Sequence, residues 1–227
     1  SIVLKAENIA KTYGNSQVKV EALKPSNLEF EQGEFVAITG KSGSGKSTLL
    51  KLLGTLETPT EGQIILDGEN VSKLSDTKLS KIRRQRIGFI YQDYSLFPEF
   101  SAYENIVMPI HLDDKKEDKE KILELMENLG ISYCKDKFPS EMSGGEQQRI
   151  CIARALLNRP KIILADEPIG NLDPDTSRQI MNILQNIREQ GAAVIMVTHN
   201  IHLLTEFPGI VYQCQDGQIV DVTQNYN

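Results

Sequence analysis

The chain has 227 residues, 40% of them hydrophobic, and a formal net charge of −6. This length allows a full hydrophobic core, so one large domain, or one domain with an added lobe, is expected. The acidic balance argues against a protein that binds nucleic acid through a positive surface, and no nucleic-acid partner is expected.

The three cysteines, Cys134, Cys151 and Cys214, lie far apart and lack the spacing of metal ligands. Such residues are expected to be small apolar side chains in a reducing compartment. No apolar run approaches the roughly 18 to 20 residues that span a bilayer, and the opening residues lack a signal-peptide pattern. These features predict a soluble cytosolic protein.

Both ends of the chain predict alternating strands and helices. Apolar runs bounded by Gly, Pro and Asp indicate strands at residues 2–9, 18–30, 35–38, 63–66, 87–91, 161–165 and 192–197, and a hairpin at 210–222. Helices are expected from Lys46, at 75–84 with Ser75 as N-cap, from Asp173-Pro174 to Gln190, and at 200–207. This alternation predicts an α/β fold with a largely parallel sheet.

Residues 94–158 have a different character and predict only helices. Helices are expected at 102–110, over 115–129, where apolar residues recur at helical spacing, and from Ser143 to about residue 158. We therefore expect a helical lobe inserted into a single domain whose catalytic core comprises residues 1–93 and 159–227.

A glycine-rich loop joins the apolar strand at 35–38 to a helix and fits the P-loop pattern. Its glycines let backbone N–H groups surround a phosphate chain, and the helix N-terminus adds donors and a favourable dipole. Lys46 supplies a positive charge to the β/γ-phosphates, and the Ser47 hydroxyl is placed for Mg²⁺. The loop predicts a nucleoside triphosphate site comprising Gly40, Lys41, Ser42, Gly43, Ser44, Gly45, Lys46, Ser47 and Thr48.

Two carboxylates, Asp166 and Glu167, end the apolar strand at 161–165. Adjacent acids at a strand end are often only a solubilising turn. Together with a P-loop, however, Asp166 can hold Mg²⁺ through its water shell and Glu167 can polarise an attacking water.

A second candidate anion site lies at Ser143-Gly144-Gly145, where a helix begins. Ser143 is a good N-cap, and a plain capped helix is the simpler interpretation. The two glycines nevertheless expose the first backbone N–H groups, as in the P-loop helix. Two half-sites for one triphosphate suggest that the second half comes from another copy of the chain.

Over nearly its whole length the chain resembles the nucleotide-binding subunit of ATP-binding cassette (ABC) transporters. The resemblance rests on Walker A at 40–48, the Q-loop residue Gln92, the signature at 143–147, Walker B ending at Asp166, then Glu167, the D-loop at 171–173 and His199. It implies a RecA-like P-loop NTPase core with a small N-terminal antiparallel β part and an inserted α-helical lobe, and it implies ATP and Mg²⁺ as ligands.

The resemblance also implies a head-to-tail dimer closed over two ATP molecules. Each ATP would lie between the Walker motifs of one copy and Ser143, Gly144 and Gly145 of the other, with Asp173 in the D-loop nearby. Glu167 would act as general base, His199 would contact the γ-phosphate, and Gln92 would couple the helical lobe to Mg²⁺ and water. Tyr13 occupies the place of the family's adenine-stacking aromatic, although a lone surface tyrosine is usually rim packing.

Residues 97–109 and 165–173 resemble the branch of lipoprotein-release, macrolide-export and cell-division ATPases. Ile169 departs from the threonine expected there, away from any phosphate group. The branch implies a peripheral protein at the cytoplasmic face of the cell membrane that drives a separate permease. The cluster Arg83-Arg84-Arg86 either faces that partner or forms a solvated helix face.

A soluble ABC ATPase and a P-loop GTPase or kinase are the two alternatives to this interpretation. Soluble ABC ATPases that act on nucleic acid or ribosomes usually carry coiled-coil insertions, zinc cysteines or two fused cassettes, which the sequence lacks. A P-loop GTPase or small-molecule kinase would lack the signature at 143–147. We therefore expect the ATP-hydrolysing subunit of a transporter complex.

Overall fold

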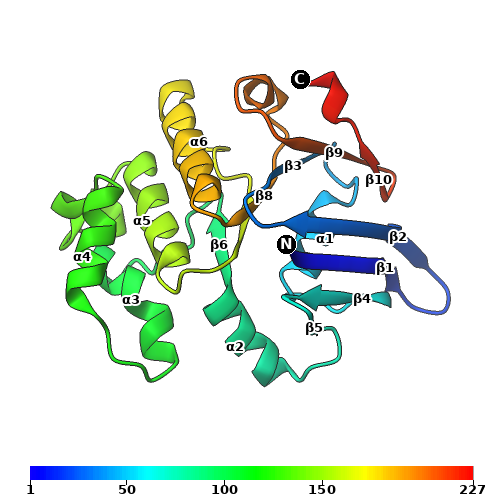
Figure 1. The fold of residues 1–227 in the computed structure, drawn as a ribbon, viewed down its shortest axis with the longest axis horizontal. Coiled ribbons are helices and arrows are strands. Elements are labelled where there is room, and N and C mark those ends of the chain that lie inside the picture. Colours follow the sequence, from blue (N-terminus) through cyan, green and yellow to red (C-terminus); the bar gives the residue numbers. More distant parts are fainter. Residues whose placement is uncertain (227) are drawn as a thin grey trace.

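A computed structural model of the protein describes residues 1–226 and contains two β-sheets. The smaller sheet is antiparallel, in the order β2-β1-β4-β5, with β1 at Ile2–Gly14, β2 at Lys19–Glu31, β4 at Glu61–Leu66 and β5 at Glu69–Asn70. Figure 1 shows these strands gathered at one end of the molecule, together with the long hairpin of β1 and β2. This sheet is the small antiparallel part that the family resemblance implied.

The larger sheet has six strands in the order β10-β9-β3-β8-β7-β6. Strands β6, β7, β8, β3 and β9 pair in parallel, and only β10 runs antiparallel to its neighbour. The prediction of a largely parallel sheet is thus confirmed. The strands are β3 at Phe35–Thr39, β6 at Ile87–Tyr91, β7 at Ile162–Asp166, β8 at Ala193–Val197, β9 at Ile210–Gln215 and β10 at Gln218–Asp221.

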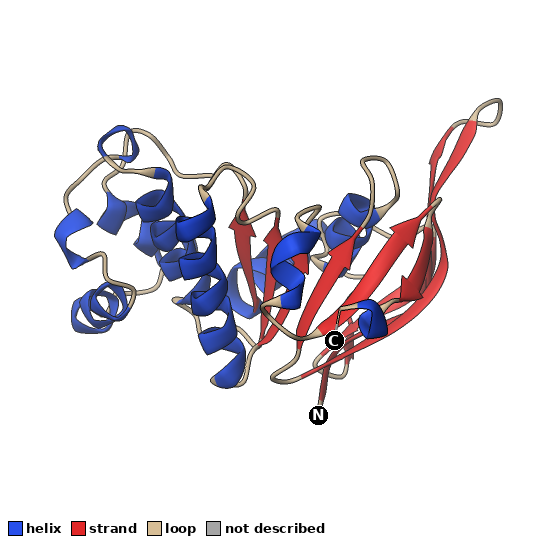
Figure 2. Ribbon diagram, turned by 90° about the horizontal axis from the view of Figure 1, so that it is seen from above, coloured by secondary structure: helices blue, strands red, loops and turns tan. Residues whose placement is uncertain are grey.

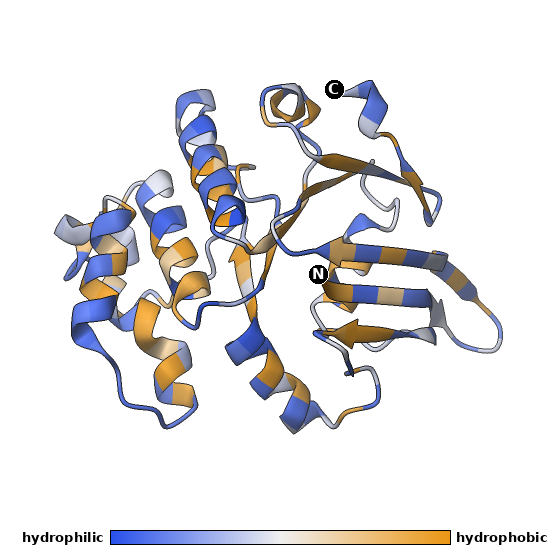
Figure 3. Ribbon diagram, in the orientation of Figure 1, coloured by the Kyte–Doolittle hydropathy of each residue, from blue (hydrophilic) through white to orange (hydrophobic). Residues whose placement is uncertain are grey.

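The larger sheet is buried on both faces, and two hydrophobic clusters divide its side chains by alternation. Ile163 and Ala165 of β7 face the cluster that contains helices α3 to α6, whereas Ile162 and Leu164 face the cluster that contains α1, α2 and the smaller sheet. Figure 3 shows the result as alternating bands on β1 and β2 and nearly continuous apolar colour on the central strands.

Helices α1 at Lys46–Leu53 and α2 at Asp76–Arg86 belong to the cluster with the smaller sheet. The opposite cluster contains α3 at Ala102–Leu112, α4 at Lys119–Asn128, α5 at Gly144–Leu156 and α6 at Pro174–Glu189. Figure 2 shows the helices concentrated at one end of the molecule and the strands at the other. Short 3₁₀ turns occupy Ser132–Cys134, Pro139–Glu141, Ile201–Thr205 and Thr223–Asn225.

Two predicted helices differ from the structure. The helix expected over 115–129 begins only at Lys119, because Asp114 has a φ of 52° and the Asp118 side chain caps the helix by accepting from Lys121 N. The short helix expected at 200–207 is a 3₁₀ turn at Ile201–Thr205. Among residues 1–226, no helix has both the length and the apolar character needed to cross a membrane.

Candidate active site

The P-loop connects β3 to α1 and depends on its glycines. Gly40 has a φ of 150°, and a Cβ there would lie 2.5 Å from Ser44 Oγ and 2.6 Å from the Cys214 carbonyl oxygen. Gly45 has a φ of 108° and precedes α1 without any side-chain cap. The first N–H groups of α1 are therefore left without a capping side chain, as an anion-binding helix terminus requires.

Lys46 folds back over this loop. Its ammonium group donates to the Gly40 carbonyl oxygen at 2.8 Å, and the residue is only 8% exposed. The Ser44 hydroxyl is buried and has no hydrogen-bond partner within residues 1–226. A charged amine and an unsatisfied hydroxyl thus lie in one cradle, with Ser47 exposed and Thr48 half-buried beside them. This arrangement suits a phosphate group.

The strand register brings the other candidate residues to the same edge of the larger sheet. Tyr91, Asp166 and Val197 are paired across β6, β7 and β8, and Val197 is paired with Ile38 of β3. Gln92, Glu167 and His199 follow these strand ends, as the P-loop follows β3. Ligands of parallel α/β sheets bind at this edge, where the carboxyl ends of the strands meet.

Asp166 is a partly buried carboxylate at the end of β7. Burial raises its pKa above the ordinary value, and neighbouring Glu167 raises it further, whereas the Lys46 ammonium acts in the opposite direction. Burial disfavours the ionised form of a carboxylate, and a nearby cation favours it, so such a group is suited to bind a cation. Ser47, Asp166 and Gln92 offer hydroxyl, carboxylate and amide oxygens, which are the ligands that Mg²⁺ prefers.

Glu167 is held in an unusual backbone conformation with a φ of 47°. Its N–H donates to the Val197 carbonyl at 2.8 Å, and its own carbonyl accepts from Gly170 N at 3.1 Å. The carboxylate lies 2.8 Å from His199 Nδ1 and accepts from His199 N at 3.3 Å. Left-handed non-glycine residues of this kind persist only where the surroundings hold them, often at active sites.

Gln92 lies against the loop that follows Glu167. Its amide donates to Asn171 Oδ1 at 3.3 Å, while the Asn171 amide donates to the Gln92 carbonyl at 3.2 Å. A Cβ on Gly170 would lie 2.7 Å from Gln92 Nε2, so a larger residue there would push the Gln92 side chain aside. The sequence analysis placed Asn171 in the D-loop but did not foresee this reciprocal pairing.

Tyr13 lies near the end of β1, where it pairs with Val20 of β2, and is 38% exposed. Its hydroxyl donates to Glu57, and the Lys11 ammonium lies 5.3 Å from the ring centroid. One ring is thereby held by a carboxylate and a cation, neither of which the sequence analysis identified. The exposed ring remains a candidate stacking surface.

Ser143 caps α5 with a complete capping box. Its hydroxyl accepts from Glu146 N at 3.2 Å, and Glu146 accepts from Ser143 N at 2.9 Å. A Cβ on Gly145 would lie 2.7 Å from Thr176 Cγ2, which shows that this segment packs on α6. The helices that follow the two glycine-rich segments, α1 and α5, belong to the clusters on opposite faces of the larger sheet.

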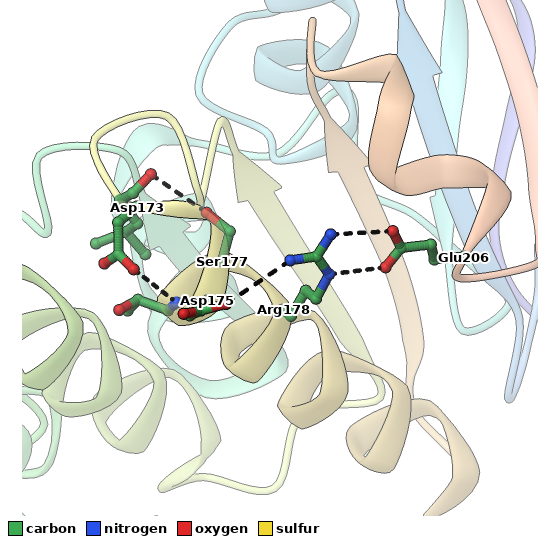
Figure 4. A network of polar contacts seen from close by, with 7 residues as sticks. Asp173, Asp175, Ser177, Arg178 and Glu206 are labelled. Atoms are coloured by element: carbon green, nitrogen blue, oxygen red, sulfur yellow. Dashed lines mark hydrogen bonds and ion pairs between the residues drawn. The ribbon is translucent and has the colours of Figure 1, made fainter.

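Asp173 caps the start of α6, where its side chain accepts from Thr176 N at 3.2 Å. Further along α6, Arg178 pairs with Glu206 through two contacts of 3.0 and 3.2 Å (Figure 4). This pair joins the helix that carries Asp173 to the segment that follows His199.

The chain matches the ABC transporter family over residues 23–170. The chain belongs to the ABC transporter family. It is 42% identical to the lipoprotein-releasing system ATP-binding protein LolD of Hyphomonas neptunium, with 98% of each chain covered. It is 44% identical to the macrolide export ATP-binding/permease protein MacB of Chlorobaculum tepidum, over 94% of this chain and 33% of that longer protein.

A solved dimeric ATP-binding cassette in a post-hydrolysis state, bound to ADP and Pi, has the same fold. The TM-score is 0.85 at 37% identity, with 96% of this chain and 98% of that chain covered. The chain itself is therefore an ATPase with the P-loop NTPase fold, as predicted from its sequence. The sequence analysis also identified the family correctly.

The arginine cluster of the ABC cassette is not a free basic patch. Arg83 donates to the Thr55 carbonyl at 2.7 Å, Arg84 pairs with Asp113 at 2.7 Å, and Arg86 pairs with Glu69 at 3.2 Å. Each of the three cations has a partner within the chain, and Arg84 and Arg86 stay partly exposed, as on a solvated helix face.

Proposed function

We propose that two copies of the chain close head-to-tail over two ATP molecules and hydrolyse them to drive a separate permease at the cytoplasmic face of a membrane. The observation that carries this proposal is that α1 and α5, each with glycines at its start, belong to the clusters on opposite faces of one sheet. Two chains related head-to-tail would bring α1 of one copy and α5 of the other to the same phosphate. The dimeric state of a similar cassette supports this arrangement.

The residues at the sheet edge supply what phosphoryl transfer requires, namely positioning and charge neutralisation. Lys46 and the N–H groups of α1 bind the phosphate chain, and Tyr13 stacks on the adenine. Glu167 accepts the proton of the attacking water, and His199 orients that carboxylate and contacts the γ-phosphate. Ser47, Asp166 and Gln92 would hold Mg²⁺, which when bound neutralises phosphate charge. The second copy contributes Ser143, Gly144 and Gly145, with Asp173 near the junction.

We further propose that residues 94–158 form the lobe that transmits movement to the permease. A surface hollow of about 310 Å³ is bordered by Tyr91 and Ser95, which flank Gln92 in the sequence. Leu56 and Phe97 also line this hollow and are 48% and 43% exposed. A short cytoplasmic segment of the permease that carries an apolar side chain would fill it. The similarity to LolD and MacB supports a permease of the lipoprotein-release or macrolide-export kind.

The test is affinity capture of the Glu167→Gln protein from gently solubilised membranes with MgATP. This variant should retain ATP and therefore keep the closed dimer on its permease, and one polytopic membrane protein should co-purify. Recovery of ribosomes or nucleic acid without a membrane protein would instead favour a soluble ABC ATPase.

Two surface variants locate the docking site. In the Glu167→Gln background, Leu56→Asp should lose the membrane protein while ATP-driven dimerisation persists. Val220→Asp, at a residue on β10 that is 52% exposed, is the matched control and should lose neither. Retention of the membrane protein by Leu56→Asp would contradict docking at this hollow.

A further inference from the structure

Gln148 is an unusual residue of α5 because it is polar and completely buried, with 0% exposure. Its Nε2 donates to the Tyr91 carbonyl at 3.0 Å and to the Pro168 carbonyl at 2.6 Å. Its Oε1 is buried without a hydrogen-bond partner among residues 1–226. A buried amide that is only half satisfied destabilises a fold relative to an apolar side chain of similar size. Packing alone therefore does not account for a glutamine here.

The two carbonyl groups that Gln148 binds belong to the candidate active site. Tyr91 immediately precedes Gln92, and Pro168 immediately follows Glu167. One side chain from the helix that begins at Ser143 thus bridges the two loops that would hold the attacking water. The two loops are also joined directly by the pairing of Gln92 with Asn171.

The bond to Pro168 bears on the backbone strain at Glu167. A left-handed φ in a residue with a long side chain is unfavourable and must be held by its surroundings. The Glu167 N–H and carbonyl are fixed by Val197 and Gly170, and the next carbonyl along the chain is fixed by Gln148. Without that bond the peptide after Pro168 would lose its restraint, and the turn that holds the Glu167 carbonyl against Gly170 N would be held less firmly.

We propose that Gln148 is a positioning residue for hydrolysis, which keeps Glu167 and Gln92 in register with the helix that carries the signature. This inference rests on the roles that the proposed function gives to Glu167 and Gln92. Movement of α5, for example when its N-terminus meets the partner's ATP, would pass directly through one side chain to both loops. Loss of this side chain should slow the chemical step without weakening ATP binding.

The experiment compares Gln148→Met with Gln185→Met. Gln185 lies on α6, and its Nε2 is likewise buried without a partner among the described residues, so it is a matched control away from the site. We expect Gln148→Met to lower kcat about tenfold or more with ATP affinity within about twofold of wild type. Dimerisation of the Gln148→Met/Glu167→Gln protein on ATP should persist. The Gln185→Met protein should hydrolyse ATP within about twofold of wild type.

A second variant, Gln148→Asn, keeps a buried amide but is too short to reach both carbonyls, and should also lower kcat at unchanged ATP affinity. If Gln148→Met does not fold, the kcat of Gln148→Asn tests the inference in its place. Equal kcat values for the Gln148 and Gln185 variants, or a loss confined to ATP affinity, would overturn the inference. An inactive wild-type protein would instead overturn the proposed function, so the two failures are distinguishable.

Discussion

Replacing Asn105 with alanine is expected to destabilise the chain by about 2 to 4 kcal/mol. Asn105 lies on α3 with 0% exposure. Its Oδ1 accepts from Phe97 N at 2.8 Å, and its Nδ2 lies 3.1, 3.1 and 3.0 Å from the carbonyl oxygens of Phe97, Phe100 and Ser101. One side chain therefore satisfies the backbone of the loop that leads from Gln92 into the helices.

The magnitude follows from counting bonds. The Asn105 amide nitrogen has two hydrogens, so it makes at most two strong hydrogen bonds to the three carbonyl groups. Together with the bond that Oδ1 accepts from Phe97 N, the side chain makes three effective hydrogen bonds. At about 1 kcal/mol each, their loss amounts to about 3 kcal/mol. The better helix propensity of alanine returns about 0.5 kcal/mol, while buried backbone groups left unpaired add to the loss.

The assay is urea denaturation of the nucleotide-free protein, with Asn128→Ala as the control. Asn128 is an exposed residue in the last turn of α4, and its replacement should change stability by no more than about 0.5 kcal/mol. A loss below about 1 kcal/mol for Asn105→Ala would refute the reasoning, because the buried bonds would then contribute less than one ordinary hydrogen bond.

Three further predictions concern the candidate active site. Lys46→Ala should weaken ATP binding at least about tenfold and abolish hydrolysis, since the phosphates lose a charge-assisted partner; wild-type affinity in a titration with fluorescent ATP would contradict this. Burial raises the pKa of Asp166 above 3.8, so the ionised carboxylate destabilises the nucleotide-free fold at neutral pH. Asp166→Asn should therefore raise Tm at neutral pH while removing Mg²⁺-dependent hydrolysis. The gain in Tm should vanish as the pH falls through the raised pKa toward 3.8. A gain in Tm that does not depend on pH would argue against burial of the carboxylate as its cause. In the Glu167→Gln background, Gly145→Asp should spare ATP binding to the monomer but prevent ATP-driven dimerisation, and a dimer at ordinary ATP concentration in light scattering would disprove a role for α5 in trans.

Local signals in the sequence predicted most elements because each depends on a few neighbouring residues. The strand at 87–91 was placed at its observed bounds, and Ser75, Ser143 and Asp173 each cap the helix expected after them. The start of α4 was misplaced because the charged segment before it is compatible with a helix in composition. The left-handed backbone at Asp114 and the N-cap at Asp118 show that the helix begins only at Lys119.

The order in which distant strands pair could not be predicted from the sequence. The insertion of β3 between β8 and β9 depends on strands more than a hundred residues away, and no local pattern specifies it. Motif spacing found the charged and glycine residues of the site. It did not single out Gln148, and it named Asn171 only as part of the D-loop, although the importance of both lies in which backbone carbonyl each one reaches.

The fold holds Glu167 against His199 in a strained backbone conformation, so the chain itself organises the candidate base. A preorganised base needs no local rearrangement to act, and control must then lie in the step that completes the phosphate site. In the proposed dimer that step is the arrival of a second α5, since the chain's own α5 packs on the face of the sheet opposite α1. We infer that closure of the proposed dimer sets the rate of hydrolysis and acts on the strained Glu167 through α5 and Gln148.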